Sequence, residues 1–368
     1  MRIFNALERF FKGCIAFFWR LFICIHELKN IWSKRKLLKG FQPTKKQAEE
    51  ARSYWKLLTG KRWPLWWHRL YASYTGKWDP RYIPEILFSV WLEPHSAKRC
   101  DMESLDDKNN LAMFVRGGGL RMPKEYVRCS AGLTSRNGAL LSSEETYGLL
   151  ADLGPCVIKR TRDSDSGRDV VVADIHGGVD VSSGKTVEDI VKSMGHDWVC
   201  QEMVSQHESV SAIYPGCVNT MRIVTYMTEA GVGAAPVALR IGQGGSKVDN
   251  AHAGGMFVYV DEGGHLAKEA FTEYQKRFTK HPDTGVVFEN HKIVGVSEAV
   301  EAAKCNHLLV GEFGFISWDV CVDAEGQPTL LEVNLLSQSV WFSQMASGRS
   351  MFGDDTPAVV KAYQHRVA

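Results

Sequence analysis

The chain has 368 residues, of which 45% are hydrophobic and 23% are charged, so its composition excludes global disorder and a fibrous structure. The length allows two or three packed units with a sizeable core. Residues 1–100 carry 20 Lys and Arg against 7 Asp and Glu, whereas residues 101–368 carry 24 against 35. A basic N-terminal region therefore precedes an acidic body, and we expect the basic region to meet an anionic partner.

Residues 1–40 contain nine basic residues, two acidic residues and a run of apolar residues at three- and four-residue steps. This spacing predicts a helix with one wide apolar face, formed by Phe4, Leu7, Phe11, Ile15, Phe18, Phe22, Ile25 and Leu28. Arg9, Lys12 and Arg20 interrupt the run, so no uncharged stretch is long enough to span a bilayer, and no signal peptide is evident. We expect this basic amphipathic segment to bind an anionic membrane surface. Packing of the helix on the body or on a partner is the alternative.

Residues 41–104 are also basic, and they contain six tryptophans, Trp55, Trp63, Trp66, Trp67, Trp78 and Trp91. Basic and aromatic residues together occur in nucleic-acid-binding proteins, but no helix-turn-helix, RNP-type or zinc-finger pattern accompanies them. We therefore predict a helical, Trp-rich subdomain that uses its tryptophans for packing, and no nucleic-acid partner.

The rest of the chain alternates between helical and strand-like patterns. Helices are expected at 103–115, 186–194 and 297–309, and strands at 156–159, 170–173, 198–204, 219–228, 234–241, 315–322 and 329–333. This order predicts an α+β protein with antiparallel hairpins. No GxGxxG follows a strand and no Walker-type phosphate loop is present. The nine cysteines include no CxxC pair, which indicates reduced thiols in a cytoplasmic protein.

The last predicted hairpin places two carboxylates opposite each other. Folding it symmetrically about its turn, 323–326, brings Asp319 opposite Glu332, with Asn334 on the same face. Two like charges at such positions repel, and Mg²⁺ bridged to phosphates is a ligand that would reconcile them. The alternative is a solvated face that tolerates acidic residues. The opposite, apolar face is expected to hold Val320, Val322, Leu331 and Val333.

The hairpin formed by 219–228 and 234–241 carries two arginines. Symmetric folding places Arg222 opposite Arg240, an arrangement that a shared phosphate or carboxylate would explain. A register shift by one residue would instead direct both side chains to solvent on a sheet edge.

Two loops are rich in residues that expose backbone N–H groups. Lys159 ends a strand and precedes the loop 161–169, in which Ser166 and Gly167 could offer N–H groups to a phosphate. Arg240 precedes the second loop, 242–255, which is interpreted as a substrate- or phosphate-contacting loop or, alternatively, as a mobile linker.

Several strings in the same order resemble the ATP-grasp superfamily, in particular its sugar-transfer-associated branch. They include Thr-Gly-Lys-Trp-Asp-Pro-Arg-Tyr-Ile-Pro at 75–84, Leu-Asp-Asp-Lys-Asn at 105–109, Val-Ile-Lys at 157–159, Gln-Glu-Met-Val at 201–204, Val-Asn-Thr-Met-Arg-Ile-Val-Thr at 218–225 and Leu-Glu-Val-Asn at 331–334. The resemblance implies two α+β subdomains that enclose an ATP site. We assign residues 105–208 to the nucleotide-binding subdomain and 209–368 to a C-terminal subdomain with the metal site.

The resemblance also implies ATP and Mg²⁺ as cofactors and a role for each matching residue. Lys108, Lys159 and Arg222 would bind phosphates, and Asp319, Glu332 and Asn334 would bind Mg²⁺. The backbone of Gln201, Glu202, Met203 and Val204 would hold adenine, and His207 or Glu208 would hold the ribose.

The implied activity is a carboxylate–amine ligase that works through an acyl phosphate, in cell-surface polysaccharide or related biosynthesis. Arg222, Arg240 and Lys159 are the expected catalytic residues, and Arg240, Asp249, Asn250, Gly254 and Gly255 the expected contacts to a small-molecule or sugar-linked substrate. The alternatives are a kinase acting on a sugar or another small molecule and a non-catalytic, nucleotide-binding scaffold at a membrane surface. For all of these we expect a cytoplasmic protein that can associate with the inner face of the membrane.

Overall fold

The computed structural model describes residues 2–162, 169–310 and 313–364. The helices are α1 Arg2–Ser33, α2 Lys45–Thr59, α3 Trp66–Thr75, α4 Glu85–Leu87, α5 Arg99–Leu105, α6 Ser143–Leu150, α7 Val187–Met194, α8 Glu208–Ser211, α9 Val296–Val310, α10 Trp341–Ser347 and α11 Thr356–Gln364. The shorter 3₁₀ or π turns are η1 Leu37–Gly40, η2 Phe88–Leu92, η3 Glu93–His95, η4 Lys108–Val115, η5 Ala251–Ala253 and η6 Gly353–Asp355.

The strands form two antiparallel sheets. The first contains β1 Glu125–Ser130, β2 Leu133–Arg136, β3 Ala139–Leu140, β4 Gly154–Arg160, β5 Val170–His176, β6 Val179–Asp180 and β7 Trp198–Glu202. The second contains β8 Met221–Thr228, β9 Gly231–Ala234, β10 Val237–Ile241, β11 Met256–Val260, β12 Ala270–Thr272, β13 Arg277–Phe278, β14 Phe315–Val322 and β15 Pro328–Asn334. The α+β class expected from the sequence is confirmed.

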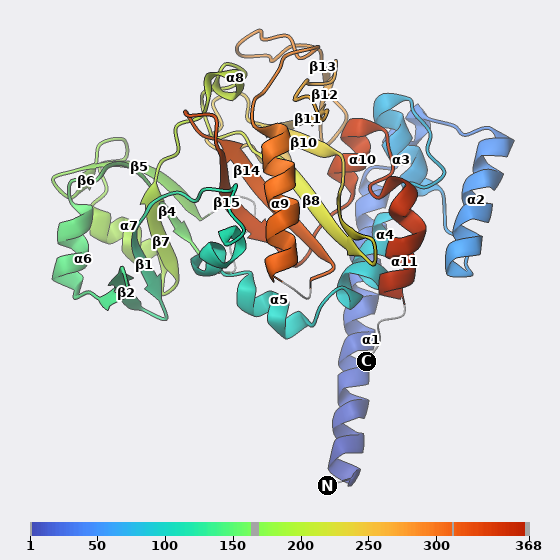
Figure 1. The fold of residues 1–368 in the computed structure, drawn as a ribbon, viewed down its shortest axis with the longest axis horizontal. Helices are drawn as coiled ribbons and strands as arrows, with labels where there is room; N and C mark the ends of the chain where they lie inside the picture. The colour runs from blue at the N-terminus through green and yellow to red at the C-terminus, as the bar shows by residue number, and fades with distance from the viewer. Residues whose placement is uncertain (1, 163–168, 311–312, 365–368) are drawn as a thin grey trace.

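The first sheet has the strand order β3-β2-β1-β7-β4-β5-β6, and it forms a separate small lobe with α6 and α7 (Figure 1). Both helices begin at an N-cap side chain that accepts a hydrogen bond from the backbone: Ser142 from Glu145 N–H, and Thr186 from Asp189 N–H. The lobe has its own apolar core, in which α7 contributes Ile190.

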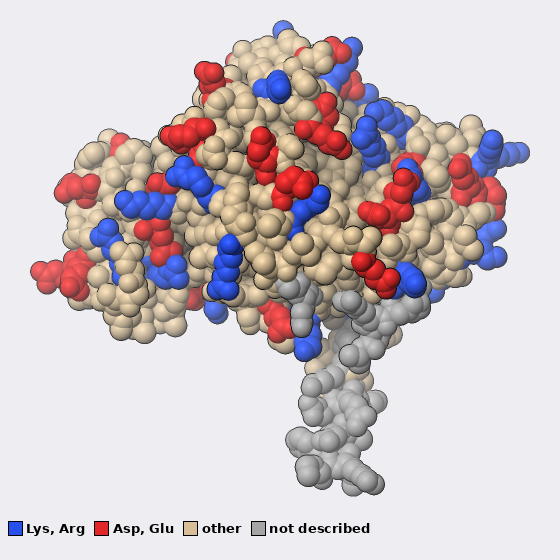
Figure 2. All heavy atoms as spheres, in the orientation of Figure 1, with Lys and Arg blue, Asp and Glu red and all other residues tan. Residues whose placement is uncertain are grey.

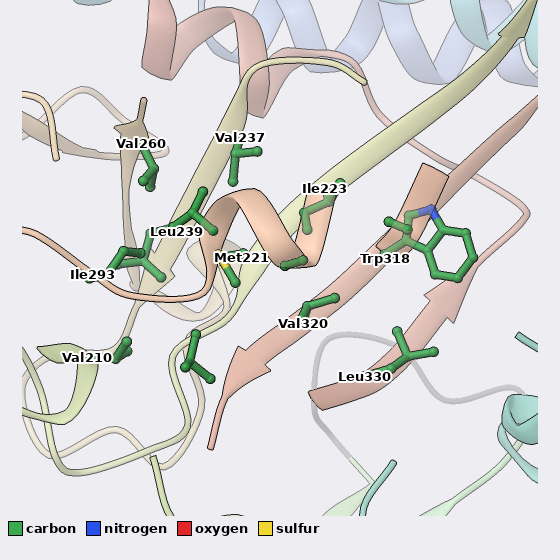
Figure 3. Close-up of a cluster of buried hydrophobic side chains, with 14 of the residues drawn as sticks. Val210, Met221, Ile223, Val237, Leu239, Val260, Ile293, Trp318, Val320 and Leu330 are labelled. Atoms are coloured by element: carbon green, nitrogen blue, oxygen red, sulfur yellow. The ribbon is translucent and has the colours of Figure 1, made fainter. Parts of the chain in front are cut away.

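The second sheet has the order β13-β12-β11-β10-β8-β14-β15, and it buries side chains on both faces. On one face, α9 covers a cluster that includes Ile223, Trp318 and Leu330 (Figure 3). On the other face, Phe315 and other aromatic residues pack against the N-terminal helices, among them fully buried Trp55. The alternation of side chains along β8 and β14 divides the two clusters.

The N-terminal helix α1 projects from the body (Figure 1). It faces the body through a row of partly or fully buried residues that includes Glu27 and Ile31. The predicted apolar face lies outward instead: Phe18 and Phe22 are 66% and 60% exposed. None of the described helices combines the length and apolar composition needed to cross a membrane.

Two predicted elements were wrong in detail. Residues 103–115 do not form one helix, because α5 ends at Leu105 and a separate 3₁₀ turn, η4, begins at Lys108 after its N-cap Asp107. The predicted hairpin of strands 219–228 and 234–241 contains an additional strand, because β9 pairs with β8 directly after the turn and β10 then continues the pairing. The predicted boundaries of the four regions of the chain stay predictions.

Candidate functional site

Asp319 on β14 is the centre of a buried group of charged side chains, here called the Asp319 cluster. The residue is 4% exposed, and its carboxylate accepts hydrogen bonds from Arg222 Nε at 2.6 Å and from a terminal guanidinium nitrogen of the same arginine at 3.2 Å. A guanidinium nitrogen of Arg240 lies 2.9 Å from Asp319 Oδ2, and Asn334 Nδ2 lies 3.5 Å from the same oxygen. Three strands, β8, β10 and β14, and the end of β15 thus converge on one carboxylate.

The electrostatics of the cluster keep this carboxylate ionised. Burial disfavours its charged form, but the guanidinium groups of Arg222 and Arg240 outweigh that effect and hold the pKa of Asp319 below its usual range. Burial also acts against the charged form of Arg240, whose pKa is nevertheless raised because Asp249 and Asp319 lie beside it. The cluster is therefore composed of charges that stabilise one another in a site shielded from water.

Thr220 and Asp249 extend the cluster toward the glycine-rich loop. Arg240 Nη2 donates to Thr220 Oγ1 at 2.6 Å, and the hydroxyl and backbone N–H of Thr220 both donate to Asp249 Oδ2, at 2.5 and 2.9 Å. Arg240 Nε lies 3.6 Å from the same carboxylate oxygen. Asp249, predicted as a substrate contact, thus lies within this cluster.

The predicted pairing of Arg222 with Arg240 was wrong. Ala238 is the residue opposite Arg222, because Ala235 and Pro236 separate β9 from β10 and the register changes there. The two guanidinium groups still meet, and the anion that they share is Asp319 of the neighbouring strand β14. The inference of a shared anion was sound, whereas the register from which it came was not.

The pairing of Asp319 with Glu332 was predicted and is present. A bulge follows it, so that Val320 lies opposite Leu330 and not opposite Leu331. Leu330 therefore enters the apolar core in place of the expected Leu331.

Two lysines approach the Glu332 end of the hairpin. Lys108 Nζ lies 2.8 Å from Glu332 Oε1, and Lys159 Nζ, from the first sheet, donates to the carbonyl oxygen of Leu331 at 3.1 Å. Burial lowers the pKa of Lys159 to about 8, with Lys108 as a further lowering influence and Glu332 as an opposing one. Both lysines that the resemblance assigns to phosphates thus lie beside the predicted metal ligands.

The donor set suits Mg²⁺. Asp319, Glu332 and Asn334 offer carboxylate and amide oxygens, which are the ligands that Mg²⁺ takes when phosphates supply the remaining positions. Among the described residues no group of three His, Cys, Asp and Glu side chains gathers, so this is not a cage made by the protein alone. The assignment of these three residues to Mg²⁺ stays a prediction.

The residues predicted to bind adenine and ribose take no part in the interactions described for Asp319 and Glu332. Gln201 and Glu202 end β7, Met203 is 41% exposed, and Val204 follows. His207 uses its Nδ1 to accept the backbone N–H of Ser209 at 3.1 Å and so caps α8, while Glu208 is exposed. Their nucleotide roles stay predictions, and Ser166 and Gly167 lie outside the described residues.

The glycine-rich loop 242–255 is anchored at several points. His281 bonds the carbonyl of Gly242 at 2.9 Å, and Asp283 accepts the N–H of Gly244 at 2.6 Å. Asn250 caps η5 through His252 N–H, and Gly254, at φ +95°, ends that turn. A side chain on Gly255 would meet the carbonyl of Asp249 at 2.6 Å, so the chain folds back tightly there.

The sequence did not reveal the contacts that hold the segment directly after Asn334, residues 335–340. Three acidic residues accept its backbone N–H groups: Asp106 that of Leu335 at 3.0 Å, Glu93 that of Gln338 at 2.6 Å, and Glu85 that of Val340 at 3.3 Å. The two residues of each of these hydrogen bonds are at least 229 residues apart along the chain, so no local sequence pattern predicts the contacts. The string Leu-Asp-Asp-Lys-Asn at 105–109 includes Asp106, but the resemblance gave a role only to Lys108.

Comparison with known families identifies the chain. The family model described as sugar-transfer associated ATP-grasp matches residues 87–359, so the chain belongs to that family. ATP and Mg²⁺, the cofactors expected from the sequence, are those that ATP-grasp enzymes use, and the expected enzyme class, an ATP-dependent ligase, agrees with this assignment. A search of curated proteins finds no significant match.

Solved structures with a similar arrangement include three enzymes. N5-carboxyaminoimidazole synthetase from Staphylococcus aureus, complexed with ADP, is 12% identical, with a TM-score of 0.41 and coverage of 70% of this chain and 52% of that one. VanG D-Ala:D-Ser ligase from Enterococcus faecalis is 13% identical (TM-score 0.37; 71% and 62%). L-amino acid ligase from Bacillus licheniformis is 14% identical (TM-score 0.38; 71% and 49%). The chain thus spans about half to three fifths of the length of these structures.

Proposed function

We propose that the protein is an ATP- and Mg²⁺-dependent carboxylate–amine ligase that forms an acyl phosphate, and that it acts in cell-surface polysaccharide or related biosynthesis. The family description supports a sugar-linked pathway. The ATP-grasp fold and the named site residues support the use of ATP.

The observation that carries the proposal is the joint charge of the site. Four cationic side chains and three carboxylates lie in one chain of contacts and close electrostatic interactions: Lys108, Lys159, Arg222 and Arg240 with Asp249, Asp319 and Glu332. The cationic side chains favour an anion, and the carboxylates favour a divalent cation. Phosphate groups carried with Mg²⁺ satisfy both requirements.

Each residue then has a definite task. Asp319, Glu332 and Asn334 would hold Mg²⁺, which when bound offsets negative charge on the transferred phosphoryl group. Lys108 and Lys159 would exchange their contacts with Glu332 and the Leu331 carbonyl for phosphate oxygens. Arg222 and Arg240 position Asp319, and Arg240, directed toward the loop 242–255 by Thr220 and Asp249, would bind the oxygens of the acyl phosphate.

Release of ADP and phosphate tests the ligase proposal. Purified full-length protein with ATP and Mg²⁺ should release both products when a carboxylate and an amine are supplied together, and Glu332→Gln should reduce the rate by about a hundredfold or more. Release of ADP with a stable phosphorylated product and no need for an amine would instead establish the kinase alternative. Failure of any nucleotide to bind would contradict both activities.

The second part of the proposal concerns α1. Six residues of its predicted apolar face are exposed, Phe11, Ile15, Phe18, Phe22, Ile25 and Leu28, and two of them, Ile15 and Phe22, also border the space between α1 and the body. Exposed basic residues, among them Lys29, Arg35 and Lys36, lie on or just after the same helix. An apolar stripe with adjacent basic side chains suits the surface of an anionic membrane, so we place the protein at the inner face of the membrane.

Vesicle binding tests this location. Full-length protein should float with vesicles that contain phosphatidylserine, and a Phe18→Glu/Phe22→Glu double variant should lose most of that binding. Leu57→Glu is the matched control, because Leu57 on α2 is 85% exposed but lies outside α1. Equal flotation of the double variant and the control would contradict the membrane role of α1.

A further inference from the structure

A large, partly open cavity lies between α1 and the body of the protein. Its volume is about 2130 Å³, and its walls come from the inward face of α1, from α3 and α4, from η3, and from residues 336–339. His252, in the glycine-rich loop, and Trp341, on α10, also line it. Most of these walls lie outside the predicted ATP-grasp core, and α1 and α3 precede the start of the family match at residue 87.

The buried charged groups of the cavity are carboxylates, whereas its basic side chains, Arg20, Lys34, Lys98 and Arg99, are partly or fully exposed. Glu27 on α1, Glu85 on α4 and Glu93 on η3 line it, and each is at most 8% exposed. Within the described part of the chain, Glu85 and Glu93 form no ion pair, and Glu27 pairs only with the exposed imidazole of His26, at 3.7 Å. Lys34 favours the charged form of Glu27 and Arg99 that of Glu93, but burial outweighs both effects. The carboxylates are therefore costly unless a ligand neutralises them or they take up protons.

Protonation is how the empty site accommodates them. Burial raises the pKa of Glu93 to about 8 and that of Glu85 well above its usual range, and mutual repulsion with Glu27 adds to both shifts. Burial likewise raises the pKa of Glu27. A bound cation would remove the repulsion among the three groups.

The chain itself shows how an ammonium group is held in this cavity. Lys34, directly after the C-terminal end of α1, places its Nζ 2.7 Å from Glu273 Oε1. The same nitrogen lies 5.5 Å from the ring centre of Tyr274 and 5.8 Å from that of Trp341. A carboxylate with aromatic faces is thus already used for a primary ammonium at one end of the cavity. Aromatic side chains also line the rest of it, including Trp19, Trp67 and Tyr71.

The cavity adjoins the Asp319 cluster through the 335–340 segment. Ser317 precedes Asp319 by two residues on the same face of β14, and its hydroxyl donates to Gln338 Oε1 at 2.7 Å. Gln338 in turn gives its backbone N–H to Glu93. Ser337, which lines the cavity, follows the predicted metal ligand Asn334 by three residues, which span at most about 11 Å. One wall of the cavity therefore lies within about 11 Å of a predicted metal ligand.

We propose that this cavity binds an amine in its ammonium form, held by Glu27, Glu85 and Glu93 between aromatic side chains, and that this amine is the co-substrate of the ligase. The ammonium group would give one proton to one of these carboxylates. The free amine would then attack the acyl carbon, and phosphate would leave with a second proton of the amine. The identification as co-substrate rests on the proposed function, whereas the binding does not. The ligand class is an amine with an apolar or sugar frame, because the walls combine buried carboxylates with aromatic rings.

Calorimetric titration of the full-length protein, without ATP or Mg²⁺, tests the binding directly. Hexane-1,6-diamine should bind with saturation, whereas hexane-1,6-diol, which has the same frame without the charge, should not. Glu27→Gln and Glu93→Gln should each weaken the binding of the diamine by about tenfold or more. Glu262→Gln is the control, because Glu262 is exposed on a turn and does not line the cavity.

The two variants lie on different elements, so misfolding of one leaves the other informative. Glu27 is on α1, and circular dichroism will establish that the Glu27→Gln protein is folded. Absence of saturable diamine binding, or equal affinity in wild type and the folded variants, would overturn the site. If amines stimulate ADP release but Glu27→Gln leaves their KM unchanged, the cavity is not the co-substrate site, while the ligase proposal stands. If the diamine binds through Glu27 but no amine stimulates ADP release, the ligase role fails and the binding site remains.

Discussion

Buried carboxyl groups have opposite pKa shifts in the Asp319 cluster and in the cavity beside α1. In the cluster, Asp319 contacts two guanidinium groups and its pKa is held low. In the cavity, Glu85 and Glu93 are equally buried, yet they accept backbone N–H groups and their pKa values are raised. Both regions lie on the side of the second sheet that meets the N-terminal helices.

The difference in pKa indicates which kind of ligand each region is suited to bind. A carboxylate already ionised between arginines is organised before any ligand arrives, which is the arrangement expected where charge develops during phosphoryl transfer. Carboxylates kept neutral by burial are incomplete without a cation. On the face shown in Figure 2, acidic and basic side chains are intermixed over the surface and are not separated into regions of one charge.

The largest effect is expected from Asp319→Asn, which removes the charge that joins Arg222 and Arg240. Two buried guanidinium groups would lose their common anion, so the free energy of unfolding should fall by about 3 kcal/mol. ADP release should be lost at the same time. Thermal unfolding and product assays check both results. Glu325→Gln, on the exposed turn of the same hairpin, should change neither by much. An Asp319→Asn protein with wild-type stability and turnover would contradict the role assigned to the charge of Asp319.

Lys159→Met should weaken ATP binding and at the same time increase the stability of the fold. Because burial lowers the pKa of Lys159 to about 8, against an ordinary value near 10.4, its charge costs free energy in the folded state at pH 7. The variant should therefore be more stable by about 1–3 kcal/mol, while its affinity for ATP falls by about tenfold or more. Exposed Lys185→Met provides the control, and calorimetry with thermal unfolding provides the measurements. Loss of both stability and affinity would indicate a structural lysine.

The smallest effect is expected from Glu93→Gln and depends on pH. Four groups act on Glu93: the carboxylate of Glu27 on α1, the guanidinium group of Arg99 on α5, the carboxylate of Asp106 directly after α5, and the backbone N–H of Gln338. The folded state keeps its proton up to about pH 8, whereas the unfolded chain releases it near pH 4.3, so wild-type stability should decline across that window. The melting temperature of Glu93→Gln should gain a few degrees on wild type between pH 5 and 8.5. A difference that stays constant with pH would contradict the raised pKa.

The sequence predicted the parts of the site that depend on one hairpin. Asp319 and Glu332 could be paired because a single turn joins their strands, and the bulge at Leu331 lies beyond their pair. The register of Arg222 and Arg240 was wrong because β9 and the residues after it intervene between their strands.

Longer-range features were outside the reach of local patterns. The apolar face of α1 was predicted, but its opposite face, which carries Glu27 toward the cavity, was not. Glu85 and Glu93 gave no signal in the sequence, because their partners in the 335–340 segment lie more than 240 residues away. Their burial follows from the way the N-terminal helices pack on the second sheet.

The most direct test of the central claim, that Mg²⁺ and ATP meet at the Asp319 cluster, is equilibrium binding of a non-hydrolysable ATP analogue to wild type and Glu332→Gln. Glu332 has a side chain 33% exposed, so the substitution should leave the fold intact. Mg²⁺ should raise the affinity of the wild type by about tenfold or more, and the variant should lose that increase. An equal increase in both proteins would contradict the assignment of the metal site.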